Sequence, residues 1–224
     1  MKMLNPYILI PSYNESRTIG DIVKALKIRG LKSYVVDDGS TDGTGAIAAR
    51  EGAAIIRHRT NLGKGASLRD GMAAVLREGC DSLIIMDGDG QHRVEDIDGF
   101  LRKAETTNAD MVIGNRMNEM SSMPYIRIIV NKLMSGILSK ISGCDIPDSQ
   151  CGFRLIKRNV LEAMKLESSN YEAESEIIIE AAKKGFKIES VPIETVYKGA
   201  PSRINPFLDT LRFIAFLLRI GFKK

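Results

Sequence analysis

Two aspartates one residue apart, Asp87 and Asp89, stand within the stretch Asp87-Gly88-Asp89-Gly90-Gln91-His92. The stretch directly follows residues 82–86, a short apolar run typical of a buried strand. Unpaired carboxylates are too costly to bury in a packed core. Their oxygens suit a hard divalent cation that holds a diphosphate and takes its remaining ligands from the phosphates. By themselves the same residues also fit a solvated turn.

Polar and charged side chains also follow other strand-like runs. Because ligands of an open α/β sheet bind outside the carboxyl ends of the strands, we expect these loops to surround one site. They are residues 11–15, 37–44, 61–65 and 114–116, and the non-periodic stretch 148–154 suits a further site loop.

Strand-like and helix-like runs alternate along the chain, which predicts an α/β fold with a mostly parallel, Rossmann-like sheet and helices on both faces. The strands are expected at residues 6–10, 34–36, 53–56, 82–86 and 110–113, with an edge or antiparallel strand within 186–197. The helices are expected between residue 16 and Gly30, at 45–50, around Leu68 to Val75, and at 94–104, 124–141 and 170–184.

The composition excludes several classes of protein. With 224 residues, 44% of them hydrophobic, the chain can form one α/β domain or two small ones. A net charge of +4 fits phosphate or anionic-membrane partners, but no nucleic acid is expected without a dense basic patch. Three cysteines without paired spacing indicate a reducing compartment. No run is long and apolar enough to span a bilayer, so a soluble or peripheral protein is predicted.

Two amphipathic segments leave alternatives open. Residues 124–141 fit either a core-facing helix pair or an adaptable apolar surface that binds a lipid chain. Residues 207–224 mix apolar and basic side chains, and fit a helix in a membrane interface, on the protein's own core or in a dimer.

The sequence also supports an interpretation of two histidines and of one cluster of acids. His92 is expected as a turn residue facing solvent, with a metal or diphosphate contact as the alternative, and His58 as structural or exposed. The acids at 172, 174 and 176 are expected as a solvated helix start.

Together these motifs resemble glycosyltransferase family 2, with its GT-A fold, and within it the dolichyl-phosphate mannose synthase-like branch of polyprenyl-phosphate glycosyltransferases. Six motifs occur in the family's order and cover most of the chain up to about residue 203. They are Pro11-Ser12-Tyr13-Asn14-Glu15, Asp37-Asp38-Gly39-Ser40 with Asp42-Gly43-Thr44, Asn61-Leu62-Gly63-Lys64-Gly65, Asp87-Gly88-Asp89-Gly90-Gln91-His92, Gly114-Asn115-Arg116 and Asp148-Ser149-Gln150-Cys151-Gly152-Phe153-Arg154. The resemblance implies a GT-A domain over residues 1–203. The apolar and basic side chains that follow predict an amphipathic helix over 204–224, with the membrane surface as one of its alternatives.

The resemblance also implies roles for individual residues. Mg²⁺ or Mn²⁺ would bind Asp87, Asp89 and Gln91. The residues that would contact the nucleotide-sugar donor are Pro11, Tyr13, Glu15, Asp38, Lys64, Asp87, Gly88, Asp89, Arg116 and Arg203.

Four residues are the implied catalytic set: Asp89, Arg116, Arg127 and Asp148. Arg127 sits where the family binds the acceptor phosphate, whereas Asn131 stands where the family has Ser and is a weaker match. Ser202-Arg203 resembles a Ser-Lys pair of the family, and Arg in place of Lys changes the donor geometry.

The chemistry of the acceptor decides which side chains are needed. A divalent cation would neutralise the diphosphate leaving group. A polyprenyl phosphate is already anionic, so it needs arginines for positioning more than a base. A direct displacement would invert the anomeric centre. A sugar hydroxyl would need a general base, for which Asp148 is the candidate.

We therefore expect an enzyme that transfers mannose from GDP-mannose to a polyprenyl (dolichyl) phosphate. It would act on the cytoplasmic face of the membrane, peripherally associated, with or without a membrane-protein partner. One alternative is transfer of glucose or N-acetylglucosamine from a UDP-sugar to polyprenyl phosphate or a sugar hydroxyl. Another is a non-catalytic nucleotide-sugar-binding subunit, against which the Asp87, Asp89, Gln91 and Arg116 pattern argues.

Overall fold

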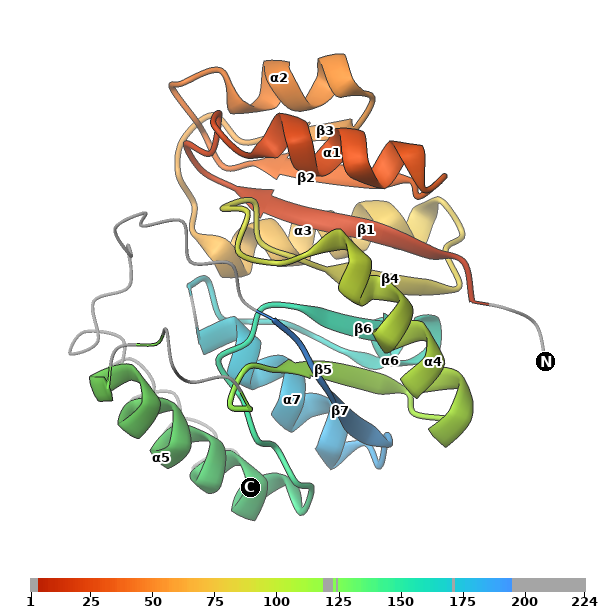
Figure 1. Ribbon diagram of the computed structural model, residues 1–224, viewed down its shortest axis with the longest axis vertical. Helices are drawn as coiled ribbons and strands as arrows, with labels where there is room; N and C mark the ends of the chain where they lie inside the picture. Colours follow the sequence, from red (N-terminus) through yellow and green to blue (C-terminus); the bar gives the residue numbers. More distant parts are fainter. Residues whose placement is uncertain (1–3, 119–122, 124, 171, 195–224) are drawn as a thin grey trace.

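The fold is a seven-stranded sheet in the order β3-β2-β1-β4-β6-β5-β7 (Figure 1). The computed structural model describes residues 4–118, 123, 125–170 and 172–194. The strands are β1 (Pro6–Ser12), β2 (Ser33–Asp37), β3 (Ala54–Arg57), β4 (Ser82–Ile85), β5 (Met111–Asn115), β6 (Arg154–Lys157) and β7 (Ile188–Pro192).

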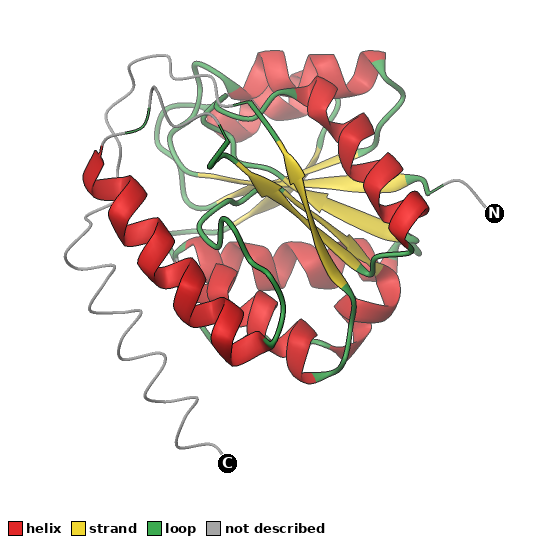
Figure 2. Cartoon of the chain, turned by 60° about the horizontal axis from the view of Figure 1, so that its bottom comes forward, coloured by secondary structure: helices red, strands yellow, loops and turns green. Residues whose placement is uncertain are grey.

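Helices cover both faces of this sheet (Figure 2). They are α1 (Ile19–Ile28), α2 (Thr44–Glu51), α3 (Lys64–Arg77), the 3₁₀ turn η1 (Val94–Asp96), α4 (Ile97–Thr107), α5 (Tyr125–Ser142), α6 (Arg158–Ala163) and α7 (Glu172–Lys183). Helices α1, α2 and α4 lie on one face, α3, α6 and α7 lie on the other, and α5 packs beside α7 (Figure 1). The predicted architecture is confirmed.

One strand runs against all the others. β6 is antiparallel to both β4 and β5, whereas the remaining pairs are parallel. The edge strand expected within 186–197 is β7, and it pairs in parallel with β5. Neither β6 nor the short α6 was predicted, because four residues after an irregular loop carry no periodic pattern.

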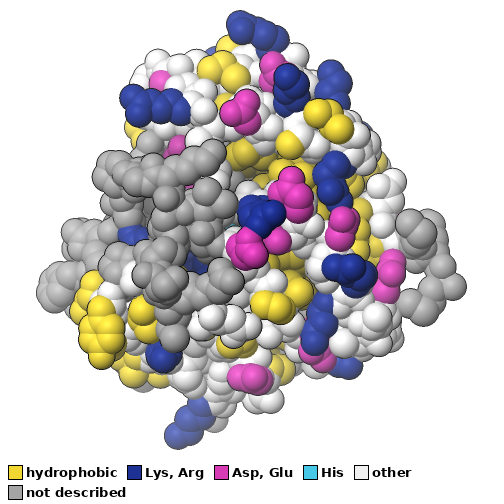
Figure 3. All heavy atoms as spheres, in the orientation of Figure 1, with side chains coloured by type: hydrophobic (Ala, Val, Ile, Leu, Met, Phe, Trp, Pro, Cys, Tyr) yellow, Lys and Arg dark blue, Asp and Glu magenta, His cyan; other side chains and the backbone are white. Residues whose placement is uncertain are grey.

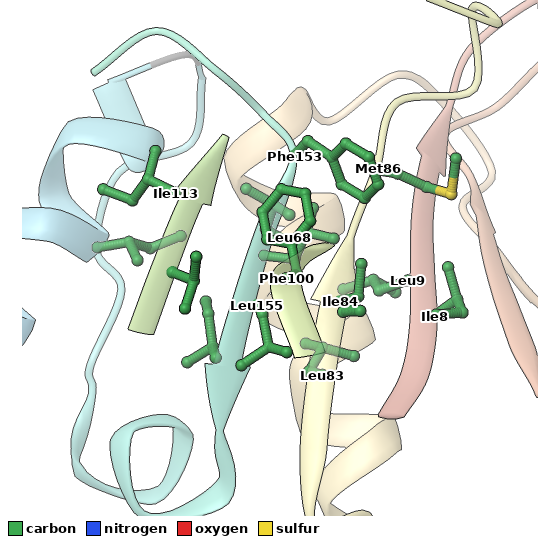
Figure 4. Packing of buried hydrophobic residues seen from close by; sticks show 14 of the residues in the cluster. Ile8, Leu9, Leu68, Leu83, Ile84, Met86, Phe100, Ile113, Phe153 and Leu155 are labelled. Atoms are coloured by element: carbon green, nitrogen blue, oxygen red, sulfur yellow. The ribbon is translucent and has the colours of Figure 1, made fainter. Parts of the chain in front are cut away.

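The core lies on both sides of the central strands. Every residue of β2 and of β4 is buried, as expected for strands that are covered on both faces. At the carboxyl end of β4, Phe153 packs against Phe100 with ring centroids 4.4 Å apart, and Met86 lies beside them (Figure 4). This aromatic cluster forms the floor under the loops at that edge.

Helix α5 presents different surfaces to the protein and to the outside. Its buried residues are Asn131, Met134, Ser135 and Leu138. Its exposed large apolar residues are Tyr125, Ile126, Ile129, Leu133 and Ile141. The expectation of a core-facing helix therefore holds for one side of α5, and the expectation of an apolar surface holds for the other.

Within the described part of the chain, no helix is long and apolar enough to cross a membrane. The C-terminal helix expected over 204–224, and with it Ser202 and Arg203, lies outside the described residues.

Candidate functional site

The predicted site loops meet at one edge of the sheet. β1, β2 and β5 end at Ser12, Asp37 and Asn115, and Asp87 follows two residues after the end of β4. Because β6 is antiparallel and pairs its first residue, Arg154, with Ile85, residues 148–152 enter at the same edge. This convergence confirms that the loops share one region.

Asp87 is paired with a buried ammonium group. Lys64 Nζ donates to Asp87 Oδ1 at 2.6 Å and to Glu174 Oε1 at 2.6 Å. Burial would raise the pKa of Asp87, but the charge of Lys64, its hydrogen bond and the charge of Arg116 outweigh it and lower the pKa to about 2. Burial acts to lower the pKa of Lys64, and the two carboxylates raise it on balance. Both groups are therefore charged at neutral pH.

Asp89 lies in the field of Asp87. Its Oδ1 accepts the backbone N–H of Gln91 at 3.0 Å. Burial, and next the negative charge of Asp87, raise the pKa of Asp89. A cation shared by the two carboxylates would relieve this repulsion.

The donor set fits Mg²⁺ or Mn²⁺. The side chains of Asp87, Asp89 and Gln91 offer hard oxygen atoms, which both ions prefer. In the described residues no group of three or more His, Cys, Asp and Glu side chains is placed to hold a metal. A metal bound here would therefore take its other ligands from water or from substrate phosphates.

Gly152 lets the backbone approach the carboxylate of Asp87. A Cβ atom at this position would lie 2.6 Å from Asp87 Oδ2 and 3.0 Å from Glu174 Oε1. Any side chain here would displace one of the two carboxylates, so the motif needs glycine at this point.

His92 is buried, so the expectation that it faces solvent is wrong. Its Nδ1 accepts the backbone N–H of Asp87 at 3.0 Å, and its ring stacks on Phe153 with centroids 4.9 Å apart. Burial lowers the pKa of His92 to about 4, which keeps the imidazole neutral. The side chain fixes the backbone at the first metal candidate.

The acids of α7 were expected to be solvated, and for Glu174 and Glu176 this is wrong. Glu174 is buried and pairs with Lys64. Glu176 is buried and accepts the backbone N–H of Glu167 at 3.1 Å and of Ser168 at 2.9 Å. A signal was available: the run Ile177-Ile178-Ile179 predicts a helix buried on several sides, whose acids need partners.

Arg116 is held by Asp148 at the end of β5. Arg116 donates from Nε to Oδ2 at 2.7 Å, from Nη2 to Oδ1 at 2.9 Å, and from its backbone N–H to Oδ2 at 3.1 Å. Asn131 Nδ2 donates to Oδ1 at 2.7 Å. Burial would raise the pKa of Asp148, but the guanidinium and these hydrogen bonds lower it. The carboxylate is therefore ionised and fully occupied as an acceptor.

Two predicted acceptor-side residues lie on α5. Asn131 is buried, bonds to Asp148, and accepts a hydrogen bond from Ser135 Oγ at 3.0 Å. Its side chain therefore points to the site loop. Arg127 is half-buried one turn earlier, on the same side of the helix as Asn131.

The predicted nucleoside loops bind to each other. The backbone N–H of Asn14 donates to Ser40 Oγ at 2.9 Å, and that of Glu15 donates to Thr44 Oγ1 at 2.8 Å. These bonds hold Pro11, Tyr13 and Glu15 beside residues 37–44. Pro11 and Glu15 are half-buried, and Tyr13 is exposed.

Asp38 organises the glycine-rich turn. It accepts the backbone N–H groups of Leu62 at 2.8 Å and Gly63 at 2.9 Å, and its Oδ1 lies 2.7 Å from His58 Nδ1. His58 is buried, as its structural interpretation requires. The carboxylate of Asp38 thus holds the turn that carries Lys64.

Arg154 lies under the site and is almost completely buried. It donates to the backbone carbonyls of Cys151 at 2.8 Å and Ser149 at 2.8 Å, and to that of Glu174. It therefore ties the 148–152 loop to α7.

Comparison with known proteins identifies the family. Residues 7–164 match the family model described as Glycosyl transferase family 2. The chain belongs to glycosyl transferase family 2. It is a glycosyltransferase, as the motifs predicted.

Two relatives of this glycosyltransferase have names that state a lipid acceptor and a sugar. The chain is 32% identical over 200 residues to polyprenol monophosphomannose synthase of Mycolicibacterium smegmatis, with 83% of this chain and 75% of the relative covered. It is 29% identical over 214 residues to UDP-N-acetylglucosamine–dolichyl-phosphate N-acetylglucosaminyltransferase of Methanococcus voltae, with 85% of each covered.

A solved structure supports the GT-A fold of this glycosyltransferase. Glucosyl-3-phosphoglycerate synthase from Mycobacterium tuberculosis, crystallised with Mn²⁺, UDP and phosphoglyceric acid, superposes with a TM-score of 0.72. The match covers 96% of this chain and 78% of that chain at 21% sequence identity. The predicted fold is confirmed.

Proposed function

We propose that this glycosyltransferase moves a sugar from a nucleoside diphosphate sugar to a polyprenyl phosphate, with inversion at the anomeric carbon. The donor we favour is GDP-mannose, and the alternative is UDP-N-acetylglucosamine or UDP-glucose. The cation would be Mg²⁺ or Mn²⁺ on Asp87, Asp89 and Gln91. The enzyme would work at the cytoplasmic face of a membrane, alone or with a membrane-protein partner.

The state of Asp148 carries this proposal. A sugar hydroxyl as acceptor requires a base, and Asp148 was the candidate. Its two oxygens accept four hydrogen bonds, and its pKa is lowered, so it is a weak proton acceptor. What it does instead is fix the guanidinium of Arg116. An arginine held in this way suits an acceptor that is already an anion.

The outer side of α5 supports a lipid acceptor. Apolar side chains at its start form a patch visible at the lower left of Figure 3, and this patch continues along the helix. Exposed apolar groups gathered on one helix are typical of a surface that meets lipid or a partner. Arg127 lies between Ile126 and the buried Asn131, so a phosphate bound near Arg127 would have its chain beside the apolar side of α5.

The names of the relatives support a polyprenyl-phosphate acceptor, but they differ in the sugar that is transferred. One relative is named for polyprenol and mannose, and the other for dolichyl phosphate and N-acetylglucosamine. The similar solved structure was crystallised with Mn²⁺ and UDP. Together they support a nucleotide-sugar donor and a divalent cation.

The proposed mechanism assigns each group one task. A divalent cation, when bound, supplies the charge that stabilises the departing diphosphate. Asp87 and Asp89 would provide its anionic ligands, and the hydrogen bond from the backbone N–H of Asp87 to His92 fixes the position of the first of them. Arg116, oriented by Asp148, and Arg127 draw the acceptor phosphate toward the anomeric carbon. The phosphate oxygen attacks without losing a proton.

The test is sugar transfer from labelled GDP- and UDP-sugars to a polyprenyl phosphate in detergent, with Mn²⁺, Mg²⁺ or chelator. We expect glycolipid from one donor, dependent on the cation and lost in Asp89→Ala. Glu162→Gln, at an exposed helical ion pair with Arg158, is the control and should retain activity. Transfer to a soluble sugar hydroxyl with no product on lipid phosphate would refute the proposal.

A further inference from the structure

Lys64 bridges two carboxylates that come from opposite parts of the chain. Its ammonium lies 2.6 Å from Asp87, just after β4, and 2.6 Å from Glu174, in the first turn of α7. The Lys64 side chain is 16% exposed and that of Glu174 is 7% exposed. The ammonium is thus a well-shielded cation on one of the two carboxylates proposed to bind the metal.

The backbone around Lys64 is clamped against the segment before α7. The N–H of Gly65 donates to the carbonyl of Ser169 at 2.9 Å, and a Cβ at Gly63 would lie 2.5 Å from the same carbonyl oxygen. Glu176 holds the other side of that segment through the N–H of Ser168. The backbone of Lys64 therefore stays close to Glu174, while the flexible four-carbon side chain can redirect its tip.

We infer that Lys64 is a resident cation that neutralises Asp87 before a metal binds, and that Glu174 is a positioning residue that retains the ammonium when the metal arrives. This inference rests on the proposed metal role of Asp87 and Asp89. A divalent ion and an ammonium on one carboxylate repel each other. An ion that arrives alone must displace Lys64 from Asp87, which leaves Glu174 as the carboxylate that holds the ammonium.

The diphosphate of the donor changes this balance. When it enters with the ion, it offers the displaced ammonium an anionic partner near Glu174. Metal and nucleoside diphosphate should therefore strengthen each other's binding by the same factor. Lys64 would be the source of that coupling.

The coupling can be measured without any acceptor. Mn²⁺ binding to the full chain is followed by the electron paramagnetic resonance signal of the free ion, with and without GDP or UDP. We expect wild-type protein to bind Mn²⁺ on the order of tenfold more tightly when the matching nucleotide is present. In Lys64→Met, Mn²⁺ alone should bind about tenfold more tightly than to wild type, and the nucleotide effect should shrink. Lys103→Met, which removes a cation paired with Glu189 far from the site, should behave as wild type.

A double-mutant cycle tests whether Glu174 acts through Lys64 or binds the metal directly. Glu174→Gln should weaken Mn²⁺ binding in the wild-type background, because the ammonium then pairs with Asp87 alone. In the Lys64→Met background the same change should have no effect. In Lys64→Met the buried Glu174 carboxylate loses its cationic partner. The double variant has no such carboxylate, so Mn²⁺ binding can still be measured with it if Lys64→Met folds poorly.

The outcomes are distinct. If Glu174→Gln lowers the Mn²⁺ affinity equally in both backgrounds, Glu174 acts on the ion directly, and the inference is overturned. Unchanged Mn²⁺ affinity in both Lys64→Met and the double variant would do the same, while leaving the proposed function intact. Wild-type protein that binds no Mn²⁺ under either condition would contradict the proposed metal dependence as well.

Discussion

Replacing Asp148 with Asn tests whether this residue holds Arg116 or acts as a base. The substitution keeps the shape of the side chain but removes the charge that accepts two side-chain bonds from Arg116. Breaking a buried ion pair by removing one partner costs about 3–5 kcal/mol. Because the Arg116 side chain is 17% exposed and keeps some access to water, we take the lower end, about 3 kcal/mol.

The loss can be measured by thermal unfolding. For a domain of this length each kcal/mol lowers Tm by about 2–4 °C, so we expect Asp148→Asn to melt about 6–12 °C lower. Glu162→Gln removes an exposed i,i+4 partner of Arg158 and should stay within about 0.5 kcal/mol of wild type. A Tm of Asp148→Asn equal to that of the control would refute the buried-pair argument.

The same variant has a predicted pH signature. The folded pKa of Asp148 lies below its unfolded value of about 3.9, so the unfolded chain binds the proton more readily. The stabilisation by ionised Asp148 is fully present above the pKa that this residue has in the unfolded chain. It is lost as the pH falls through the lower pKa that it has in the folded protein. Wild-type protein should therefore lose more of its stability than Asp148→Asn between neutral pH and pH 3. Residual transfer activity of the variant should keep the wild-type pH profile, whereas loss of one limb of that profile would identify Asp148 as a base.

Three further variants, each with its own expected result, test other parts of the structure. Gly152→Ala places a Cβ against Asp87 Oδ2, so donor binding in calorimetry should weaken by about tenfold or more; Gly136→Ala, with open space around its Cβ, should bind normally. His92→Phe leaves the backbone N–H of Asp87 without its acceptor and should destabilise the fold by about 1–3 kcal/mol in urea; wild-type stability would contradict the assigned hydrogen bond. Ile129→Ser with Leu133→Ser should reduce sedimentation with anionic lipid vesicles at little cost in Tm, while Ile28→Ser, at an exposed position of α1, should sediment as wild type.

Much of the fold follows from local patterns in the sequence. Apolar runs such as residues 82–86 and the glycines and polar loops after them are sufficient to predict parallel strands whose ends converge. The direction of β6 has no such local cause. It is set by its pairing with β4 and β5, whose residues lie far away in the chain.

The missed site residues share one physical reason. Glu174 resembles any acid at a helix start until Lys64, 110 residues away, is placed beside it. His92 resembles a turn residue until Phe153 and the N–H of Asp87 enclose its ring. A polar side chain becomes buried only when the tertiary structure brings its partner, and a single sequence does not contain that information.

Arg154 has a consequence for how the protein can be handled. It lies within electrostatic reach of three carboxylates, and with the two other cations of the site it matches them in number: Lys64, Arg116 and Arg154 against Asp87, Asp148 and Glu174. Before any ion binds, these three cations and three carboxylates balance one another, and Asp89 adds a further negative charge beside them. We therefore expect the protein to fold without a bound cation. It should purify, store and refold in the presence of a chelator, and the cation can be added or exchanged afterwards.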